Sequence, residues 1–556
     1  MNSISLEGTD QQALLSRLEN LVSIGIELSN QRNLDQWFDR ILDAAQELTN
    51  SDGGTIYLIR DGRLHFVTLR NVSLGIHQGE QNDHALSHEP IPLHLPDGDL
   101  NLTTVSTSAA VLGKTINIAD AYDSTSYDFS GTYAFDARNH YRSQSFLTVP
   151  MRNHESEVIG VLQLINAKDA KTGAIVPFDR NDQYLVESLA SQAAIVFTNR
   201  QLIQRLEDLF ISFIKVINIA LDEKSPYTHG HCQRVPEITM LLAEAVGRTR
   251  EGPLQAFQLD AAGRKELEIA ALMHDCGKIT TPVHIVDKAT KLQSLFDRIH
   301  LLDTRVEVLK RDARIRMLEA RLAHPEDTTL AASLETRYAQ EIDELNQDRD
   351  FLRTANIGSE FMPTVSQERV HEIAARYQWV NEDGQQVPFL SDDEREKLSI
   401  SRGTLSDEER EIINYHIVAT IKMLEALPWP KHLKNVPEFA GGHHERMDGQ
   451  GYPKGLSREQ MSVQARMMAI ADIFEALTAS DRPYKAGMPL SRALYILGRM
   501  CQKGHIDPDL FDIFIREKVY LAYAQAHLQV EQIDEVVETD IPAYQGQEGR
   551  VWAEKQ

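Results

Sequence analysis

The sequence has few of the features that mark secreted or membrane proteins. Only three cysteines occur in 556 residues, at Cys232, Cys276 and Cys501, and they form no CxxC pair. Scattered cysteines of this kind are typical of a reducing compartment. No apolar run reaches the roughly 18 residues that a membrane helix needs, and the first residues lack both a basic and an apolar signal segment. We therefore expect a cytoplasmic protein without a membrane-spanning helix.

Positive charge is scarce as well. The chain has 57 Lys and Arg residues and 82 Asp and Glu residues, which gives a formal net charge of -25. Such an acidic surface argues against duplex nucleic acid or an anionic membrane as the main partner. A small anionic substrate stays compatible with this charge, because local cations and metal ions can reverse the potential inside one cleft. The length allows two or more domains, each with its own core.

The N-terminal half is predicted to fold as an α+β domain. Apolar spacing predicts helix within residues 12–50, and two strands follow that are joined at Asp61-Gly62, a strong hairpin signal. A polar loop region over about 75–105, a strand at 158–166 and a long helix that begins near Asp179 complete the pattern. Helix, antiparallel sheet and helix in this order are typical of a sensor domain.

This half, over residues 12–188, resembles a GAF domain. The segment Asn166-Ala-Lys168 … Phe178-Asp-Arg-Asn-Asp182-Gln183 looks like the Asn-Lys…Phe-x-x-x-Asp-Glu signature of GAF domains that bind cyclic nucleotides. It departs from the signature because Lys168 is displaced by one residue and Gln183 replaces Glu. The resemblance implies a small-molecule ligand held by Asn166, Lys168, Phe178 and Asp182. A strand end followed by a helix with an acidic first turn explains the same residues without a ligand.

Helical spacing continues beyond Leu189. Apolar residues three and four apart form the seam of a coiled coil, and Asn199 within it favours a parallel dimer in register. We predict a coiled-coil signalling helix over 189–221 that joins two copies of the chain; a helix packed on its own domain is the alternative. The predicted seam consists of Leu189, Gln192, Val196, Asn199, Ile203, Leu206, Phe210, Phe213 and Ile217.

The rest of the chain is predicted to be almost entirely helical. Helical spacing defines a domain in two parts, 222–295 and 402–522. The intervening residues 296–401 predict an insertion built on an antiparallel helical hairpin, with a second, shorter hairpin that turns at Asp383-Gly384. Residues 523–556 form an acidic tail that we expect to be partly disordered.

An apolar helix near residue 270 ends in three residues that suggest chemistry. His274 and Lys278 are four residues apart and share a helical face, and Asp275 lies between them. A carboxylate next to an imidazole can bridge two metal ions while the imidazole binds one of them. The lysine is then placed to reach a phosphate oxygen.

Similar side chains recur in the other helical segments. Asp472 lies in an otherwise apolar helix, where it must be paired, protonated or bound to metal. A mixed imidazole and carboxylate set suits Fe, Mn, Ni or Zn rather than Mg or Ca. Seven side chains are too many for one ion and suit two, which can stabilise displacement at phosphorus. The candidate ligands are His231, His274, Asp275, His416, His443, His444 and Asp472.

Outside the insertion, residues 222–522 resemble an HD-GYP phosphodiesterase, a subgroup of the HD superfamily that cleaves cyclic dinucleotides such as cyclic di-GMP. The matching segments are Tyr227-Thr-x-x-His231, His274-Asp-x-Gly-Lys-Ile279, Leu405-Ser-Asp-Glu-Glu-Arg…His416, His443-His-Glu-x-x-Asp-Gly-x-Gly-Tyr-Pro-x-Gly-Leu456, Asp472-x-Phe-x-Ala-Leu477 and Arg482-Pro-Tyr-Lys485.

This resemblance implies roles for individual residues. The seven candidates become metal ligands, with Asp275 bridging, and Asp275 and Lys278 become the catalytic residues. Phosphate contacts are assigned to Lys278, Arg482 and Lys485, and the substrate face to Asp448, Gly451, Tyr452 and Pro453. Some members of the family carry Glu at the position of Tyr227 and hold a third ion, so we predict two ions and a linear dinucleotide product. The insertion is a second departure and leaves the substrate open.

We therefore predict a multidomain chain in which an α+β GAF-like sensor domain precedes an all-α HD-type domain with a helical-hairpin insertion. Its predicted function is metal-dependent hydrolysis of cyclic di-GMP, or alternatively cyclic GMP-AMP, with Fe or Mn preferred over Ni or Zn. Three alternatives stay open. They are a cyclic-dinucleotide receptor whose insertion blocks catalysis, an HD-type enzyme that hydrolyses nucleotides or alarmones, and a scaffold that recruits partners such as a cyclic-dinucleotide synthase.

Overall fold

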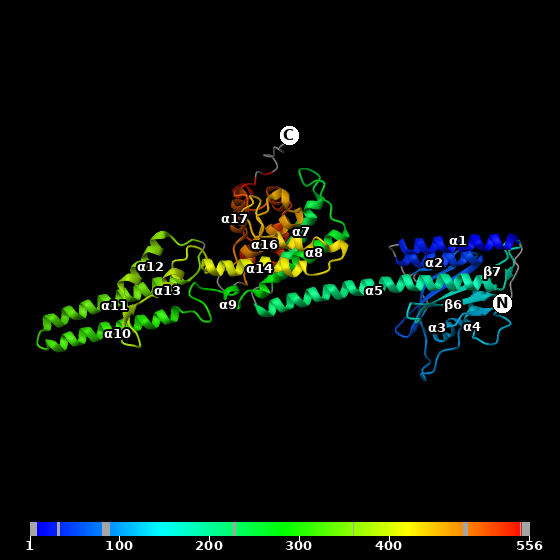
Figure 1. Cartoon of the computed structure of the whole chain (residues 1–556), viewed down its shortest axis with the longest axis horizontal. Coiled ribbons are helices and arrows are strands. Elements are labelled where there is room, and N and C mark those ends of the chain that lie inside the picture. Colours follow the sequence, from blue (N-terminus) through cyan, green and yellow to red (C-terminus); the bar gives the residue numbers. More distant parts are fainter. Residues whose placement is uncertain are drawn as a thin grey trace. The chain divides into compact units, whose positions relative to one another are not determined.

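The chain folds into two compact units, Met1–Leu209 and Phe210–Gln556, of which Figure 1 shows the elements. This computed structural model describes residues 8–30, 34–79, 89–225, 230–359, 361–481, 487–544 and 546. None of the helices in these ranges combines the length and apolarity that crossing a bilayer requires. The predicted organisation, an α+β unit followed by a helical unit that carries a helical hairpin, is confirmed.

The first unit is an antiparallel sheet with helices on both faces. Its main strands run in the order β3-β2-β1-β7-β6-β5, while β4 pairs with β2 and β8 with β7. The strands are β1 (Ser51–Arg60), β2 (Arg63–Asn71), β3 (Ile76–Gly79), β4 (Ile91–Pro92), β5 (Ile116–Ile118), β6 (Phe146–Arg152), β7 (Val158–Lys168) and β8 (Ile175–Val176).

Alternation along the strands separates the two faces of this sheet. Ile56 and Leu58 lie in one core with α1 (Gly8–Asn30), α2 (Leu34–Thr49) and the start of α5 (Arg180–Lys224). Tyr57 points to the opposite face, where α3 (Val105–Leu112) packs, and residues of α4 (Ser130–Asn139) line a cavity together with Tyr57.

The sequence predicted most of these elements. The hairpin at Asp61-Gly62 is confirmed: β1 pairs with β2, and both turn residues have positive φ. The region expected to be a polar loop at about 75–105 is instead partly strand, because β3 and β4 both add to β2. Residues 80–88 of that region lie outside the described ranges.

The long helix α5 continues to Lys224, as predicted, but its apolar residues are not all on one free surface. Leu189 lies in the core of the first unit, and Phe210 and Ile217 pack against the core of the second. Leu206 and Phe213 are exposed. Part of the predicted seam therefore serves the chain's own cores.

The second unit has a helical core centred on α16, which is buried along most of its length. Serine caps begin two of its helices: Ser406 forms a capping box with Glu409, and Ser462 accepts from the backbone of Ala465. The helices are α7 (His231–Arg248), α8 (Ala261–Met273), α9 (Val283–Val286), α14 (Asp407–Glu425), α15 (Val436–Gly441), α16 (Val463–Thr478), α17 (Leu490–Gln502), α18 (Pro508–Arg516) and α19 (Val519–His527).

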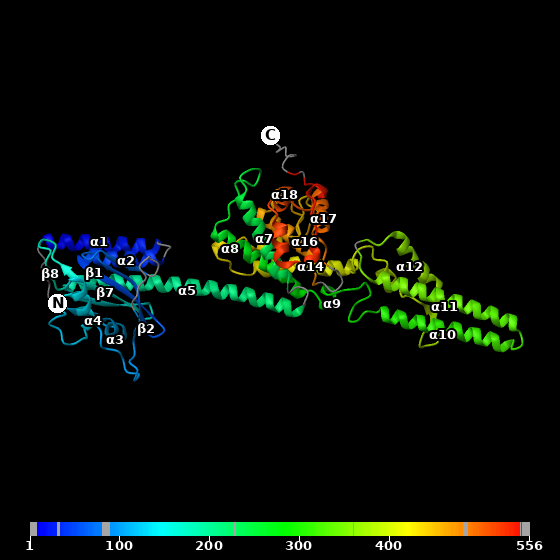
Figure 2. The ribbon, with the colours of Figure 1, turned by 180° about the vertical axis from the view of Figure 1, so that it is seen from behind.

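The insertion has a small core of its own, and Figure 2 shows its two long helices side by side. The helical hairpin and the turn at Asp383-Gly384 are both confirmed. The elements are α10 (Ile299–Ala323), α11 (Thr328–Asn356), α12 (Thr364–Arg376), β9 (Gln378–Val380), β10 (Gln386–Pro388) and α13 (Asp392–Leu398).

The acidic tail contacts the helical core within residues 523–544, and partial disorder of the tail stays a prediction. Gln532 Nε2 donates to the backbone oxygens of Thr478 at 2.8 Å and Met488 at 3.1 Å. Ile541 is buried in the helical core. These contacts with distant residues outweigh the acidic composition of the segment.

Candidate metal centre

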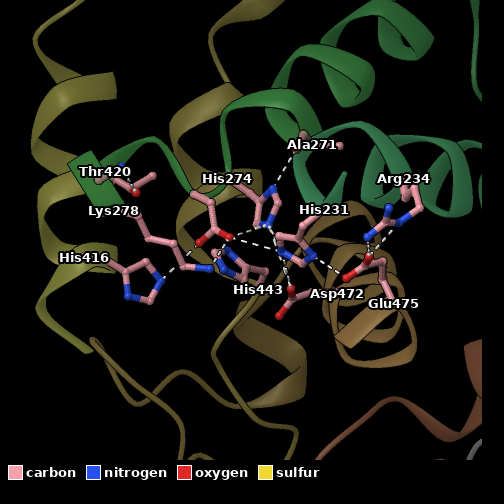
Figure 3. A network of polar contacts seen from close by, with 12 residues as sticks. His231, Arg234, Ala271, His274, Lys278, His416, Thr420, His443, Asp472 and Glu475 are labelled. Atoms are coloured by element: carbon pink, nitrogen blue, oxygen red, sulfur yellow. Dashed lines mark hydrogen bonds and ion pairs between the residues drawn. The ribbon is translucent and has the colours of Figure 1, made fainter. Parts of the chain in front are cut away.

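Five segments of the helical unit bring imidazole and carboxylate side chains to one buried place, part of which Figure 3 shows. All seven candidate ligands meet there. They come from the start of α7 (His231), the residues after α8 (His274 and Asp275), the middle of α14 (His416), the turn after α15 (His443 and His444) and α16 (Asp472).

The first group of donor atoms surrounds one oxygen of Asp275. Asp275 Oδ2 lies 3.1 Å from His231 Nε2 and 3.2 Å from His274 Nε2. Asp472 Oδ1 lies 3.2 Å from His231 Nε2 and 3.8 Å from His274 Nε2. Two imidazoles and two carboxylates therefore share one small volume.

The second group faces the other oxygen of the same carboxylate. Asp275 Oδ1 lies 3.3 Å from His416 Nε2, and His416 Nε2 lies 3.1 Å from His444 Nε2. The donor atoms of His416, His443 and His444 all lie within 4.8 Å of one another. Asp275 thus presents one oxygen to each group, which is the arrangement a carboxylate needs to bridge two cations.

Backbone carbonyls fix the tautomer of three of these imidazoles. The Nδ1 of each contacts the backbone oxygen three residues earlier, at 2.7 Å for His274 and 2.6 Å for His443, and likewise for His416. A carbonyl oxygen can only accept, so Nδ1 carries the proton. Nε2 is in each case the ring nitrogen directed into the centre.

Both carboxylates of the centre are held in the ionised form. Burial alone would raise the pKa of Asp275, but Lys278 and the surrounding imidazoles outweigh it and hold the pKa well below its usual range. Burial opposes ionisation of Asp472 in the same way, and His231 reverses the effect, so that its pKa is also well below normal.

Two buried atoms of the centre have no hydrogen-bond partner among the described residues, Asp275 Oδ1 and His443 Nε2. Burial, reinforced by His274, lowers the pKa of His443 to about 4, so its imidazole is neutral near pH 7. The Nε2 atoms of His231 and His274 lie only 3.3 Å apart. The nitrogen and oxygen donors in this arrangement fit a divalent transition metal.

The turn that carries Lys278 packs tightly against α14. It forms the 3-10 helix η1 (Cys276–Thr280), and Lys278 Nζ donates to Asp275 Oδ2 at 2.5 Å. The backbone N–H of Gly277 donates to Thr420 Oγ1 at 2.9 Å. A Cβ atom on Gly277 would fall 2.0 Å from the backbone oxygen of His416, so only glycine permits this close approach.

The end of α5 is attached to the same turn. Lys224, the last residue of α5, donates through Nζ to the backbone oxygens of Lys278 at 3.2 Å and Thr281 at 2.6 Å, and to that of Ile279. One ammonium group therefore satisfies three carbonyls of the turn and its continuation.

The Gly-rich loop after the histidine pair is held by a buried carboxylate. Glu445 accepts from the backbone N–H groups of Lys454 at 2.7 Å and Leu456 at 2.9 Å. Within the loop, Tyr452 stacks on His444. The loop is thus a wall of the centre rather than a free surface segment.

The structure places the other predicted substrate residues around this loop. Asp448 pairs with Arg446 at 2.6 Å, and Pro453 follows a cis peptide bond. Gly451 packs so closely on Glu445 that a Cβ atom there would fall 2.5 Å from the Glu445 Cα. Arg482 and Lys485 lie outside the described residues.

Sequence reasoning missed two residues that support the centre. Glu475 is fully buried in α16 and contacts His231 Nδ1, and its other oxygen accepts from Arg234 Nε at 2.7 Å. Burial would raise the pKa of Glu475, but His231 and Arg234 reverse this and lower it to about 2. The sequence did contain a sign of this role, because Glu475 is a second carboxylate in the apolar helix, three residues after Asp472.

The predicted ligand residues of the GAF domain have structural partners. Asn166 is fully buried and hydrogen-bonds to backbone groups, and Phe178 lies in the core. Lys168 pairs with Asp52, and Asp182 pairs with an arginine of α1 at 2.6 Å. Ligand binding by these four residues stays a prediction.

A cavity of about 500 Å³ lies elsewhere in the same unit, and none of the four residues lines it. Aromatic and polar side chains share its wall, among them Tyr57, Arg70, Phe129, Phe146 and Gln163.

Comparison with known families agrees with the two kinds of fold. Residues 33–197 match the family model described as GAF domain. Residues 228–348 and 393–510 each match a model described as HD domain. The two HD matches are separated by residues 349–392 of the insertion, and together they include all seven candidate ligands.

Curated relatives match only in short regions. A 3'3'-cGAMP-specific phosphodiesterase of Vibrio cholerae is 43% identical over 81 residues, which are 15% of this chain and 19% of the relative. A cyclic di-GMP phosphodiesterase of Pseudomonas aeruginosa is 40% identical over 115 residues, 20% of this chain and 26% of the relative. The chain thus spans about a quarter or less of the length of these relatives.

Proposed function

This chain joins a GAF domain to an HD domain, and we propose that it is a metal-dependent phosphodiesterase of the HD-GYP type that hydrolyses a cyclic dinucleotide. The observation that carries the proposal is the position of Asp275, whose two oxygens face two separate groups of donors. The names of the relatives support cyclic di-GMP or cyclic GMP-AMP as the substrate.

The centre would hold two divalent transition-metal ions, Fe or Mn in preference to Ni or Zn. Asp275 would bridge them. When bound, such a pair activates water and neutralises charge on a phosphoryl oxygen. One ion would take the first group, His231, His274 and Asp472, and the other would take His416, His443 and His444.

Lys278 would hold the substrate phosphate. Burial lowers its pKa, but Asp275 and Asp472 outweigh burial and raise it above the ordinary value, so the ammonium stays charged. A charged donor beside the bridging carboxylate can stabilise the negative charge that develops on a phosphate oxygen. Tyr452, stacked on His444, would form the wall against which the substrate lies. We propose a linear dinucleotide as the product.

Regulation would come from the GAF domain and from dimerisation through α5. The cavity of about 500 Å³ is the candidate site for a small-molecule ligand of the GAF domain. The exposed residues of α5 support a coiled coil that keeps Asn199, Leu206 and Phe213 of the predicted seam and replaces the other members after Asn199 by the residues directly before them. Leu202, Leu209 and Val216 would alternate with Asn199, Leu206 and Phe213 at heptad spacing.

The test is hydrolysis of both cyclic dinucleotides by the full chain and by a double variant, His274→Ala with Asp275→Ala. We expect the parent to turn over at least one of them and the double variant to lose turnover while it keeps its helical circular dichroism. His284→Ala, an exposed histidine on α9, is the matched control and should behave as the parent. Undiminished turnover by the double variant would contradict the proposal.

A further inference from the structure

We propose that Glu475, supported by Arg234, is a positioning residue that holds His231 in place for metal binding. This inference depends on the proposed function, because it concerns a ligand of the same centre. It assigns a role to two residues that touch neither the substrate face nor the other candidate ligands.

His231 differs from its neighbours in how its Nδ1 is held. His274, His416 and His443 each use the backbone oxygen three residues earlier. His231 is the first residue of α7, so no carbonyl of its own helix precedes it by three positions. The Glu475 carboxylate, from α16, takes the place of that carbonyl (Figure 3).

The contact fixes both the tautomer and the direction of the ring. A carboxylate accepts, so Nδ1 carries a proton and Nε2 is presented to Asp275 and Asp472, at 3.1 and 3.2 Å. A negative charge at Nδ1 also makes Nε2 a stronger electron-pair donor than a neutral carbonyl would. Histidines held by a carboxylate in this way bind metal more tightly.

The negative charge of the buried Glu475 carboxylate is compensated by the guanidinium group of Arg234. Arg234 lies three residues after His231, on the same face of α7, and donates through Nε to Glu475 at 2.7 Å. Its NH2 group also donates to Asp481 at 2.9 Å. The chain makes room for this pair with Gly230, where a Cβ atom would fall 1.9 Å from Arg234 and 2.8 Å from Asp481.

The four residues therefore form one continuous chain of contacts, His231–Glu475–Arg234–Asp481. Asp481 directly precedes the segment with Arg482 and Lys485, for which phosphate contacts are predicted. The chain of contacts thus leads from a candidate ligand to the start of a candidate substrate segment.

The experiment compares Mn²⁺ binding by the metal-free full chain and by Glu475→Gln, using titration calorimetry. Glutamine keeps the size of the side chain but removes its charge and offers a donor to Arg234. We expect Mn²⁺ affinity at one site to fall by about 10- to 100-fold. Turnover should fall at limiting Mn²⁺ and recover in part at saturating Mn²⁺.

Glu266→Gln is the control for a purely structural effect. Glu266 is another buried carboxylate of the helical core and accepts from the backbone and side chain of Asn435. This variant should melt earlier than the parent but bind Mn²⁺ equally well. If Glu475→Gln does not fold, Glu475→Asp, whose carboxylate is one methylene shorter, should bind Mn²⁺ several-fold more weakly.

Parent-like Mn²⁺ affinity in the folded Glu475 variant would overturn this inference and leave the proposed function intact. If the parent itself binds no Mn²⁺ and hydrolyses neither cyclic dinucleotide, the proposed function fails, and the role of Glu475 fails with it.

Discussion

Tyr452 stacks on His444 with the ring centroids 4.9 Å apart and the ring planes inclined by 19°. Glu445, the residue directly after His444, holds the same loop by accepting hydrogen bonds from two of its backbone N–H groups. The loop and the second donor group are therefore parts of one rigid arrangement. A change that loosens the loop should weaken the predicted substrate contacts more than metal binding, because contacts outside the loop set the tautomers of the imidazoles.

Glu445→Gln tests this relationship. The amide can accept only one of the two backbone N–H groups, so we expect the free energy of unfolding to fall by about 1–3 kcal/mol. The KM for cyclic dinucleotide should rise, while Mn²⁺ stoichiometry stays that of the parent. Steady-state kinetics and thermal melting measure both. Glu459→Gln, an exposed residue close by, is the control, and an unchanged KM in Glu445→Gln would show that the loop does not depend on this carboxylate.

Lys278→Met removes the ammonium group beside Asp275. If that group stabilises charge on the phosphate, kcat should fall by about 100- to 1,000-fold. Mn²⁺ should still bind, because no candidate ligand is lost. Single-turnover kinetics at saturating Mn²⁺ are the measurement, with the exposed Lys434→Met as control. A kcat within twofold of the parent would remove Lys278 from the mechanism.

Lys291 should make stability depend on pH at the base of the insertion. It is buried, donates to the backbone oxygen of Leu398 at 3.0 Å, and burial lowers its pKa to about 8. In the unfolded chain the pKa is about 10.4, so between these values the unfolded state binds more protons and stability rises with pH. Below about pH 8 the buried charge destabilises the fold by about 3 kcal/mol.

Lys291→Met is therefore expected to stabilise the protein at pH 7, and the difference from the parent should shrink to nothing near pH 10.4. Denaturant titrations at several pH values measure it. A difference that does not vary with pH would mean that the pKa of Lys291 is the same in the folded and the unfolded protein, so that its charge is compensated in the fold.

Leu206→Asp combined with Phe213→Asp tests the dimer. Both side chains are exposed on α5 and would occupy equivalent heptad positions in the seam. Two charges on each helix would face two like charges on the partner, so light scattering should give the monomer mass. Gln204→Glu, on the outer face of the same helix, should leave the mass of the parent. A parent that is monomeric at micromolar concentration would contradict the coiled coil.

The candidate metal centre was the part of the structure that could best be predicted from the sequence. His274 and Asp275 at the end of an apolar helix, and Asp472 within another, are costly to bury unless they meet partners. The sequence could not place Glu475 with them, because its partner His231 lies 244 positions away and belongs to another helix.

Apolar periodicity was less informative for α5, because one side of this helix packs on the chain's own cores while another is exposed. It predicted a seam through Phe210 and Ile217, but both pack on the chain's own helical core. The free stripe is the neighbouring one, through Leu209 and Val216. In the tail, Ile541 is buried in the helical core, a contact that the acidic composition of the segment does not reveal.

The ammonium group of Lys224 ties the end of the long helix directly to the turn that carries Lys278. A shift of the helix end by one residue, a rise of about 1.5 Å, would stretch its bonds to Lys278 and Thr281 beyond hydrogen-bonding length. Three carbonyl oxygens would then lose this shared donor at once, although that of Lys278 would keep the backbone N–H of Thr281. The short segment that bears Lys278 can therefore respond to a movement far smaller than the width of one side chain.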